Sequence, residues 1–253
     1  MITKNDLKSL VGEFAPAIAR DQRTRTSIRV GAIGHRNIDD AVRKKLVVTV
    51  KEVLNLVRQS AEKALRQPHV RELFADGLDF VVISPLAEGA DRLIAQAALA
   101  QKYRLGAILP FNVADYEATF DPEDRAKSVT EFRTLLDAAA PPDGYGIFAF
   151  DGDATAGPQR DAAFMDCART VIGWSDILIA ILSEDKVRSR TGRSVQEAID
   201  AGVPVILIDP KQPDSFTLRL CADGRKTSSS AHAQRVREFI VSLLTHRQST
   251  STK

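Results

Sequence analysis

The sequence predicts an α/β fold, a single doubly wound parallel sheet of the Rossmann type with helices on both faces. Two observations support this class. Short apolar runs recur along the 253 residues, and amphipathic helical patterns lie between them. Runs that are apolar on both alternating faces are typical of strands covered on both sides. Regular alternation of strand and helix favours right-handed crossovers within one sheet.

The apolar runs predict six strands in chain order, all of them rich in β-forming residues. They span residues 28–33, 80–84, 105–111, 146–150, 177–182 and 203–208. Helices are expected where apolar residues recur three or four positions apart. These helices span residues 39–66, 89–102, 124–139, 160–174 and 194–201. The last of them ends at Gly202, a residue type common just after a helix C-terminus.

The chain divides into a central domain and two flanks. The Rossmann-like domain is expected over residues 28–210. Residues 1–27 predict an N-terminal helical extension, with one short helix at 5–19 and a charged link. Residues 211–253 predict a C-terminal extension with a short strand near 216–220, a helix at 231–244 and a disordered tail.

Composition narrows the class of function. The net charge of +2 gives no support for nucleic acid or an anionic membrane as the main partner. No run approaches the roughly 18 apolar residues of a spanning helix, and the N-terminus lacks a signal-peptide pattern. We therefore expect a cytoplasmic protein. Two distant cysteines and four histidines without ligand spacing lead us to expect neither a disulfide scaffold nor a metal site.

Open parallel sheets bind ligands at the carboxyl ends of their strands, so the loops that follow the strands are the candidate site. The first loop contains Gly34, His35 and Arg36. Glycine allows backbone to approach a ligand, and arginine holds phosphate through two parallel hydrogen bonds. The segment lacks the Gly-x-Gly-x-x-Gly pattern of dinucleotide sites. A plain turn with two surface cations explains these residues equally well.

The second loop contains Glu88, Gly89, Asp91 and Arg92. Gly89 permits a tight turn into a helix whose backbone amides can hold phosphate. Asp91 suits the first turn of that helix, and Glu88 can accept hydrogen bonds from ribose hydroxyls. The alternative is a helix cap for Asp91 and a surface ion pair for Arg92. We favour a ligand role for Gly89 and leave Arg92 open.

The third candidate is the polar segment 191–197, with Thr191, Gly192 and Arg193 at its start. It follows a basic loop after the fifth predicted strand and leads into a helix. Ser194 followed three residues later by Glu197 is a capping-box pattern. That pattern alone nearly accounts for both of these residues.

Several motifs taken together resemble the SLOG superfamily, which groups Rossmann-like domains similar to the LOG phosphoribohydrolases, DprA and the TRPM channel sensor domain. They are GAIGHR (31–36), ISPLAEGADRL (83–93), LGAILPF (105–111), DYEATF (115–120), EFRTLL (131–136) and SDILIAIL (175–182). The segment LAEGADRL is the most specific, and the resemblance covers about residues 29–209. It implies a pocket for a nucleotide or nucleotide-derived ligand, formed by Gly34, His35, Arg36, Glu88, Gly89, Asp91, Arg92 and segment 191–197.

One departure from the pattern bears on catalysis. Active LOG-type enzymes carry a Gly-Gly-x-Gly-Thr-x-x-Glu motif where this chain reads RTGRSVQE at 190–197. Gly192 and Glu197 match, but the glycine-rich phosphate cradle is reduced. The resemblance therefore implies binding more than catalysis, and Arg193 can supply positive charge to a phosphate.

Three functions remain open. The first is a sensor domain that recognises a nucleotide signal and acts through an effector protein. The second is a hydrolase that cleaves the N-glycosidic bond of a nucleotide, with Glu197 or Glu88 stabilising the oxocarbenium-like centre. The third is an interaction scaffold that uses the basic C-terminal helix. No cofactor besides the nucleotide ligand is expected, and a homodimer is a candidate assembly.

Three structural expectations follow. His35 and Gly89 should face one cleft, because both follow buried strands. Trp174 should have a structural role and pack at the edge of the sheet. Arg36 should either bind the ligand or form an ion pair with Asp39 or Asp40 at the start of the long helix.

Overall fold

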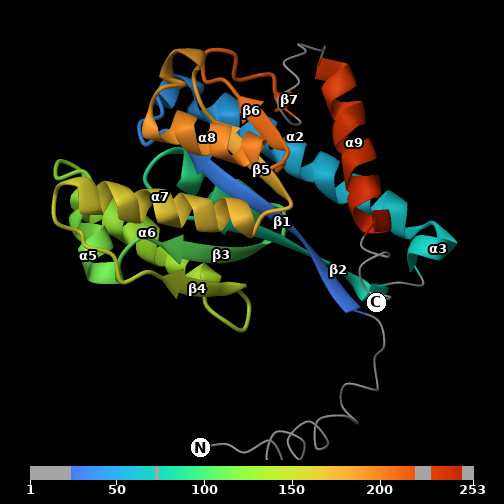
Figure 1. Ribbon diagram of the computed structural model, residues 1–253, viewed down its shortest axis with the longest axis horizontal. Coiled ribbons are helices and arrows are strands. Elements are labelled where there is room, and N and C mark those ends of the chain that lie inside the picture. The colour runs from blue at the N-terminus through green and yellow to red at the C-terminus, as the bar shows by residue number, and fades with distance from the viewer. Residues whose placement is uncertain (1–23, 72–73, 220–228, 247–253) are drawn as a thin grey trace, which may run out of the picture.

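The computed structural model describes residues 24–71, 74–219 and 229–246 (Figure 1). The predicted helix at 5–19 and the tail beyond residue 246 lie outside the described residues. Within the described ranges, no helix combines the length and apolar character needed to cross a membrane.

The described strands form one sheet of seven in the order β4-β3-β2-β1-β5-β6-β7. Every neighbouring pair is parallel except β6 and β7, so the sheet is mixed at one edge. The strands are β1 (Thr24–Gly34), β2 (Phe74–Ser84), β3 (Arg104–Leu109), β4 (Gly146–Ala149), β5 (Ile177–Ile181), β6 (Val205–Ile208) and β7 (Thr217–Arg219). The predicted α/β class and all six predicted strands are confirmed.

Helices cover both faces of this sheet. One face packs against α2 (Asp40–Leu65), α4 (Ala90–Ala100), α6 (Arg125–Ala139) and α9 (Ser229–His246), and the other against α7 (Pro158–Gly173) and α8 (Arg190–Asp200). Ile179 points into the first core, and its neighbours Leu178 and Ala180 point into the second. Because successive strand residues face opposite sides, both layers need apolar side chains, which explains the continuous apolar runs.

The remaining helices are short. They are α3 (Pro68–Arg71), α5 (Val113–Ala118) and a 3₁₀ turn at Glu184–Lys186. The sequence analysis did not predict them, because segments of this length carry little periodicity.

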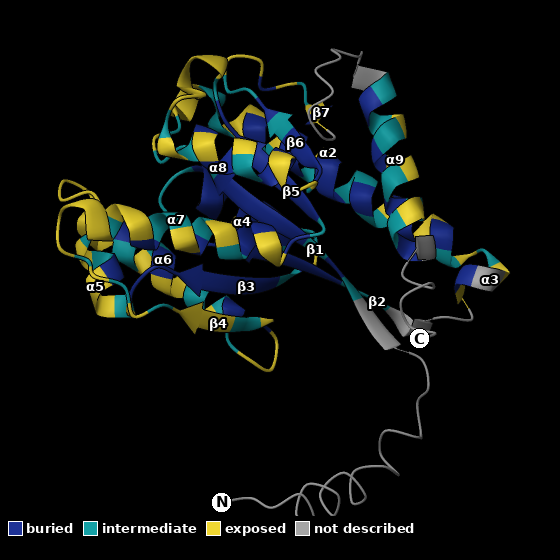
Figure 2. Ribbon diagram, in the orientation of Figure 1, coloured by how far each residue is buried: buried dark blue, intermediate teal, exposed yellow. Residues whose placement is uncertain are grey.

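The run at 146–150 was predicted to be buried on both faces, and this is wrong. β4 is an edge strand, and Ile147 and Phe148 are each 43% exposed (Figure 2). Trp174 ends α7 and packs against Phe148, with ring centroids 5.9 Å apart. It therefore packs at the sheet edge as predicted, although its side chain is 42% exposed.

The helix predicted at 194–201 begins earlier than expected. α8 starts at Arg190, where Ser189 caps it by accepting a hydrogen bond from the Gly192 amide at 3.1 Å. Segment 191–197 is therefore helical rather than a loop. Ser194 lies inside the helix and donates to the Arg190 carbonyl, so the predicted capping box of Ser194 and Glu197 is wrong.

Candidate functional site

The order of the strands places a crevice between β1 and β5. The chain runs from β1 through β2 and β3 to β4, then returns to the other side of β1 for β5 and β6. Where the strand order reverses in this way, the loops after the two central strands diverge and leave room for a ligand. The loops in question are those after Gly34 and after Ile181.

Gly34 ends β1 at a point with no space for a side chain. A Cβ atom there would lie 2.3 Å from the Ala90 Cβ and 2.8 Å from the Ile181 carbonyl oxygen. The next amide, that of His35, donates to this same Ile181 carbonyl at 3.1 Å. The end of β1 is thus packed tightly between β5 and the start of α4.

Gly89 joins the second loop to the first. Its backbone has φ +86° and ψ −119°, which residues with a Cβ rarely adopt, and a Cβ would lie 1.9 Å from the Arg36 carbonyl oxygen. The following amide, that of Ala90, donates to the His35 carbonyl at 2.9 Å. His35 and Gly89 therefore lie at the same end of the sheet. The prediction that both face one cleft is not confirmed, because His35 lines the two cavities described next and Gly89 lines neither. The Ala90 amide contacts protein backbone instead of the phosphate that the sequence analysis assigned to this turn.

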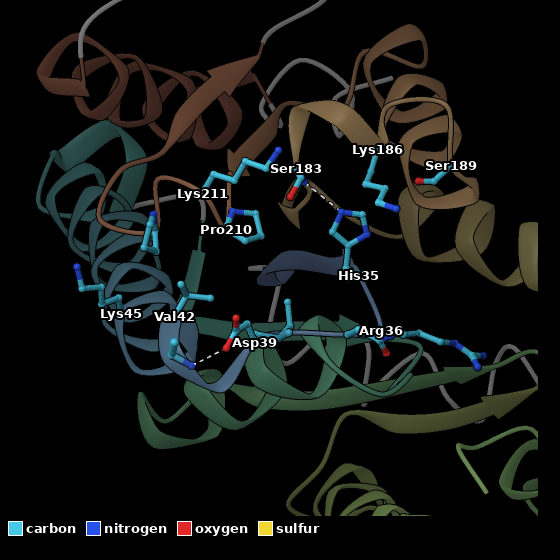
Figure 3. Close-up of a pocket in the computed structure, with 14 residues that line it drawn as sticks. His35, Arg36, Asp39, Val42, Lys45, Ser183, Lys186, Ser189, Pro210 and Lys211 are labelled. Carbon is cyan, nitrogen blue, oxygen red and sulfur yellow. Dashed lines mark hydrogen bonds between the residues drawn. The ribbon is translucent and has the colours of Figure 1, made fainter. Parts of the chain in front are cut away.

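A cleft of about 870 Å³ opens beside His35, and we call it the basic cleft (Figure 3). It is lined by the loops after β1, β5 and β6 and by the first turns of α2. Three lysines contribute to its lining. Lys45 pairs with Asp214 at 3.1 Å and Lys211 with Asp185 at 3.2 Å, whereas Lys186 forms no ion pair with a described residue.

His35 is held in one tautomer. Its Nε2 atom accepts a hydrogen bond from the Ser183 amide at 3.1 Å, so a neutral ring carries its proton on Nδ1 (Figure 3). Burial and the charge of Lys186 lower the pKa of His35. The neutral ring can therefore offer an N–H donor at neutral pH.

A second cavity of about 240 Å³ adjoins the basic cleft, and we call it the chamber. His35, Arg36 and Ser189 line both cavities. Arg36 forms neither of the ion pairs considered from the sequence: its guanidinium carbon lies 5.3 Å from the centre of the Phe164 ring, and Nη1 donates to the Thr119 carbonyl at 3.4 Å. Arg190 lies over the same ring at 5.0 Å.

The chamber also contains two buried polar side chains. Asp91 is 4% exposed and Tyr116 is fully buried, and both line the cavity. The Oδ1 atom of Asp91 and the hydroxyl of Tyr116 have no hydrogen-bond partner within the part of the chain that the structure describes. Asp91 makes no side-chain cap on α4, so the alternative of a helix cap is wrong. Cys167 lines the wall, and its thiol donates to the Ile108 carbonyl.

The structure brings some of the predicted site residues together. Gly34, His35, Arg36, Asp91 and Thr191 all line the chamber, and the Thr191 hydroxyl donates to the Gly34 carbonyl at 3.4 Å. Gly192 is buried in the first turn of α8, where a Cβ would lie 2.0 Å from the Val187 carbonyl oxygen.

The two predicted catalytic glutamates and two of the predicted arginines lie elsewhere. Glu88 accepts hydrogen bonds from the Asp121 amide and the Ser128 hydroxyl. Glu197 pairs with Arg169 at 3.1 Å, and with Arg193 it lines a separate groove of about 590 Å³ between α7 and α8.

Arg92 points into the protein core and is 2% exposed. Its Nε donates to the Leu86 carbonyl at 3.0 Å, and its Nη1 donates to the Ser128 carbonyl at 2.9 Å and pairs with Glu131 at 3.2 Å. Its guanidinium carbon lies 4.6 Å from the centre of the Phe120 ring. These contacts join α4 to α6, so Arg92 has a structural position outside both cavities. The surface ion pair considered from the sequence is wrong.

Several residues that line the cavities were not predicted from the sequence. Lys186 and Arg190 lie in the basic loop after the fifth predicted strand, and Tyr116 lies in the DYEATF motif. Phe164 and Lys211 carried no local signal, because one lies in an ordinary amphipathic helix and the other in a polar link.

The buried carboxyl of Asp91 is expected to make the stability of the protein depend on pH. Burial raises the pKa of Asp91 to about 8, although nearby backbone amides and the charge of Arg36 oppose this. An unfolded aspartate has a pKa of about 3.9, so between the two values the native state holds a proton that the unfolded state has released. Stability contributed by this group is therefore lost as pH rises, by about 1.4 kcal/mol per pH unit.

We expect the free energy of unfolding of the wild type, relative to Asp91→Asn, to fall by about 3 kcal/mol between pH 5 and pH 7. Urea denaturation at several pH values measures it. Asp137→Asn, on the exposed side of α6, controls for the loss of one carboxyl. Parallel pH curves for wild type and Asp91→Asn would contradict the prediction.

Comparisons with known proteins give a structural likeness at low sequence identity. No protein-family model matches the chain, and neither does any curated protein sequence. Among solved structures, it is similar to DNA processing protein A (DprA) from Streptococcus pneumoniae, with a TM-score of 0.41 and 14% identity over 72% of this chain and 50% of that one.

It is also similar to DNA processing protein A from Helicobacter pylori, whose structure concerns a single-stranded DNA binding mode. There the TM-score is 0.41 and the identity 14%, over 87% of this chain and 82% of that one. Of the Streptococcus pneumoniae protein, this chain spans about half the length. The similarity to DprA covers most of this chain and concerns its fold alone.

Proposed function

We propose that this chain binds a nucleotide or nucleotide-derived ligand at the carboxyl ends of β1 and β5, as the recognition domain of a sensor. The main support is the pair of adjoining cavities at the reversal of strand order, which share His35 and Arg36. The basic cleft carries three lysines, and the chamber combines aromatic and apolar walls with polar groups such as Asp91 and Arg190. A nucleotide likewise joins a charged phosphate to a planar base that has polar groups on its edge.

The basic cleft suits the phosphate. Lys186 and Lys211 approach it from the loops after β5 and β6, and His35 offers the Nδ1 proton from β1. Among the described residues, Asp39 is the one acidic residue in the lining, and its carboxylate accepts a hydrogen bond from the Ala41 amide at the start of α2. Charge-assisted hydrogen bonds of this kind are about twice as strong as neutral ones.

The hydrolase has less support, because neither proposed catalytic carboxylate lines the two cavities. Glu88 is engaged by Asp121 and Ser128, and Glu197 by Arg169. The scaffold has less support because α9 buries its apolar residues Val236 and Ile240 in the core of the domain. Recognition of a ligand therefore explains more of the site than either alternative.

The proposal is tested with Arg36→Ala. Arg36 lines both cavities, and its side chain has one hydrogen bond to the described residues, at 3.4 Å. A charge-assisted contact contributes about 1.5–3 kcal/mol, so we expect nucleotide affinity to fall by roughly one to two decades. The melting temperature should change little, because the side chain carries few core contacts.

Affinity is measured by calorimetry with a panel of nucleoside monophosphates and dinucleotides, and chromatography of the same mixtures detects any product. Arg43→Ala is the matched control, since Arg43 pairs with Asp40 on the surface of α2. Unchanged affinity in Arg36→Ala would remove Arg36 from the site, and release of a free base would favour the hydrolase.

A further inference from the structure

We infer that the chamber binds the base of the ligand, and that Asp91 and Tyr116 select a heterocycle with an amino group beside a ring nitrogen, as in adenine or cytosine. This inference rests on the proposed function, because it assigns the phosphate to the basic cleft next door. It adds a specificity that the phosphate contacts do not supply.

The size and lining of the chamber fit a ring system and no more. Pockets that enclose whole drug-sized ligands usually measure about 300–1,000 Å³, and the chamber measures about 240 Å³. Its walls include Ile33, Pro85, Phe164 and Ala168, which offer apolar and aromatic surface. Because Arg36 lines both cavities, one side chain lies within reach of a base in the chamber and of a phosphate in the basic cleft.

Two buried polar atoms without a hydrogen-bond partner among the described residues belong to side chains that line the chamber, and they point to a ligand. Buried polar atoms are almost always hydrogen-bonded, since leaving one unpaired is costly. Asp91 Oδ1 and the Tyr116 hydroxyl are both buried without a partner among the described residues, and both residues line the same small cavity. A ligand that bonds to them restores these interactions.

The aromatic surroundings fix the position of Tyr116. Its ring packs against Phe120 at 5.2 Å, Phe132 at 5.5 Å and Phe111 at 6.3 Å between centroids. Such packing leaves the ring little freedom to rotate away. The hydroxyl is therefore held in position, as a selective contact requires.

The protonation of Asp91 decides which base fits. The Asp91 carboxyl already accepts hydrogen bonds from the backbone amides of Ala87 and Gly34, and Oδ1 is the oxygen without a partner among the described residues. A neutral carboxyl can therefore offer a ligand a donor at Oδ1, whereas a carboxylate offers an acceptor there. The ring nitrogen of adenine or cytosine accepts from such a donor, and the amino group beside it can donate to the Tyr116 hydroxyl. Guanine presents two adjacent donors, which would suit the carboxylate. Burial holds the pKa of Asp91 at about 8, which keeps the carboxyl neutral at pH 6.5.

The experiment compares matched probes by calorimetry at pH 6.5. The probes are adenosine and inosine monophosphate, cytidine and uridine monophosphate, ribose 5-phosphate, and adenosine. We expect adenosine monophosphate to bind at least about tenfold more tightly than inosine monophosphate. Cytidine monophosphate should likewise bind more tightly than uridine monophosphate, because each mismatched base loses a buried hydrogen bond.

Three variants assign the preference to residues. Asp91→Leu should remove it and leave the affinity for ribose 5-phosphate unchanged. Asp91→Asn should retain it, because the amide oxygen can accept the backbone amides while the amide nitrogen places a donor at the Oδ1 position. Tyr116→Phe should reduce it, which keeps the test valid if Asp91→Leu does not fold. Raising the pH to 9 should weaken the preference in the wild type and leave it unchanged in Asp91→Asn.

The outcomes separate this inference from the proposed function. Equal affinities for the paired nucleotides and ribose 5-phosphate would overturn the inference and leave phosphate binding in place. A second outcome is that adenosine binding depends on Asp91 while the phosphate adds no affinity. That result would support the base site in the chamber and overturn the phosphate site in the basic cleft. If no probe binds, both are overturned.

Discussion

Replacing Gly89 with alanine is expected to lower the free energy of unfolding by more than about 4 kcal/mol and to abolish ligand binding. The new Cβ would lie 1.9 Å from the Arg36 carbonyl oxygen and 2.4 Å from that of His35. Both obstacles are backbone atoms, so no side-chain rotation relieves the contact. The positive φ of Gly89 adds a conformational cost of about 1–3 kcal/mol.

The measurement is chemical denaturation together with calorimetry of the folded fraction. Gly173→Ala is the matched control, because a Cβ there would meet no atom within 4 Å and φ is not positive. That variant should be neutral or slightly more stable. A Gly89→Ala protein with wild-type stability would show that the loops after β1 and β2 are not locked together as the structure has them.

Replacing Arg92 with alanine is expected to lower the free energy of unfolding by about 3–5 kcal/mol. The change leaves the buried carbonyls of Leu86 and Ser128 without their donor and opens a space beside Phe120. Because Arg92 lies outside both cavities, nucleotide affinity should remain within about twofold at temperatures where the variant is folded.

This result distinguishes the two roles that the sequence left open for Arg92. Arg125→Ala, on the exposed start of α6, is the control for removing an arginine near the same helix pair. A fall in nucleotide affinity without a loss of stability would return Arg92 to the binding site.

The sheet could be predicted because its central strands are buried on both faces, which leaves a continuous apolar run. The exposure of β4 could not, since Ile147 and Phe148 are as apolar as core residues. Their position at the edge depends on the order of strands, which is set by crossovers between distant segments. The start of α8 was missed because Ser189 and Ser194 are both suitable caps. The close approach of Gly192 to Val187 favours the earlier one.

The site residues, too, could be predicted from the sequence only in part. Asp91 and Arg92 are neighbours with similar signals in the sequence, yet one lines the chamber and the other joins α4 to α6. Successive helix residues point about 100° apart, so adjacent positions seldom share an environment. His35 could be found from the end of its strand. Phe164 and Lys211 reach the site only through the tertiary fold.

The main chain and side chain of His35 form hydrogen bonds to three residues in two segments: to Ile181 and Ser183 at the end of β5, and to Ala90 at the start of α4. The conformational entropy of this loop is therefore lost when the protein folds and not when a ligand arrives. Ordering a loop on association weakens affinity, and a loop that is already ordered avoids that cost. A ligand entering this crevice meets donors already in place, so complex formation is expected to proceed as rigid docking, with little rearrangement of the backbone.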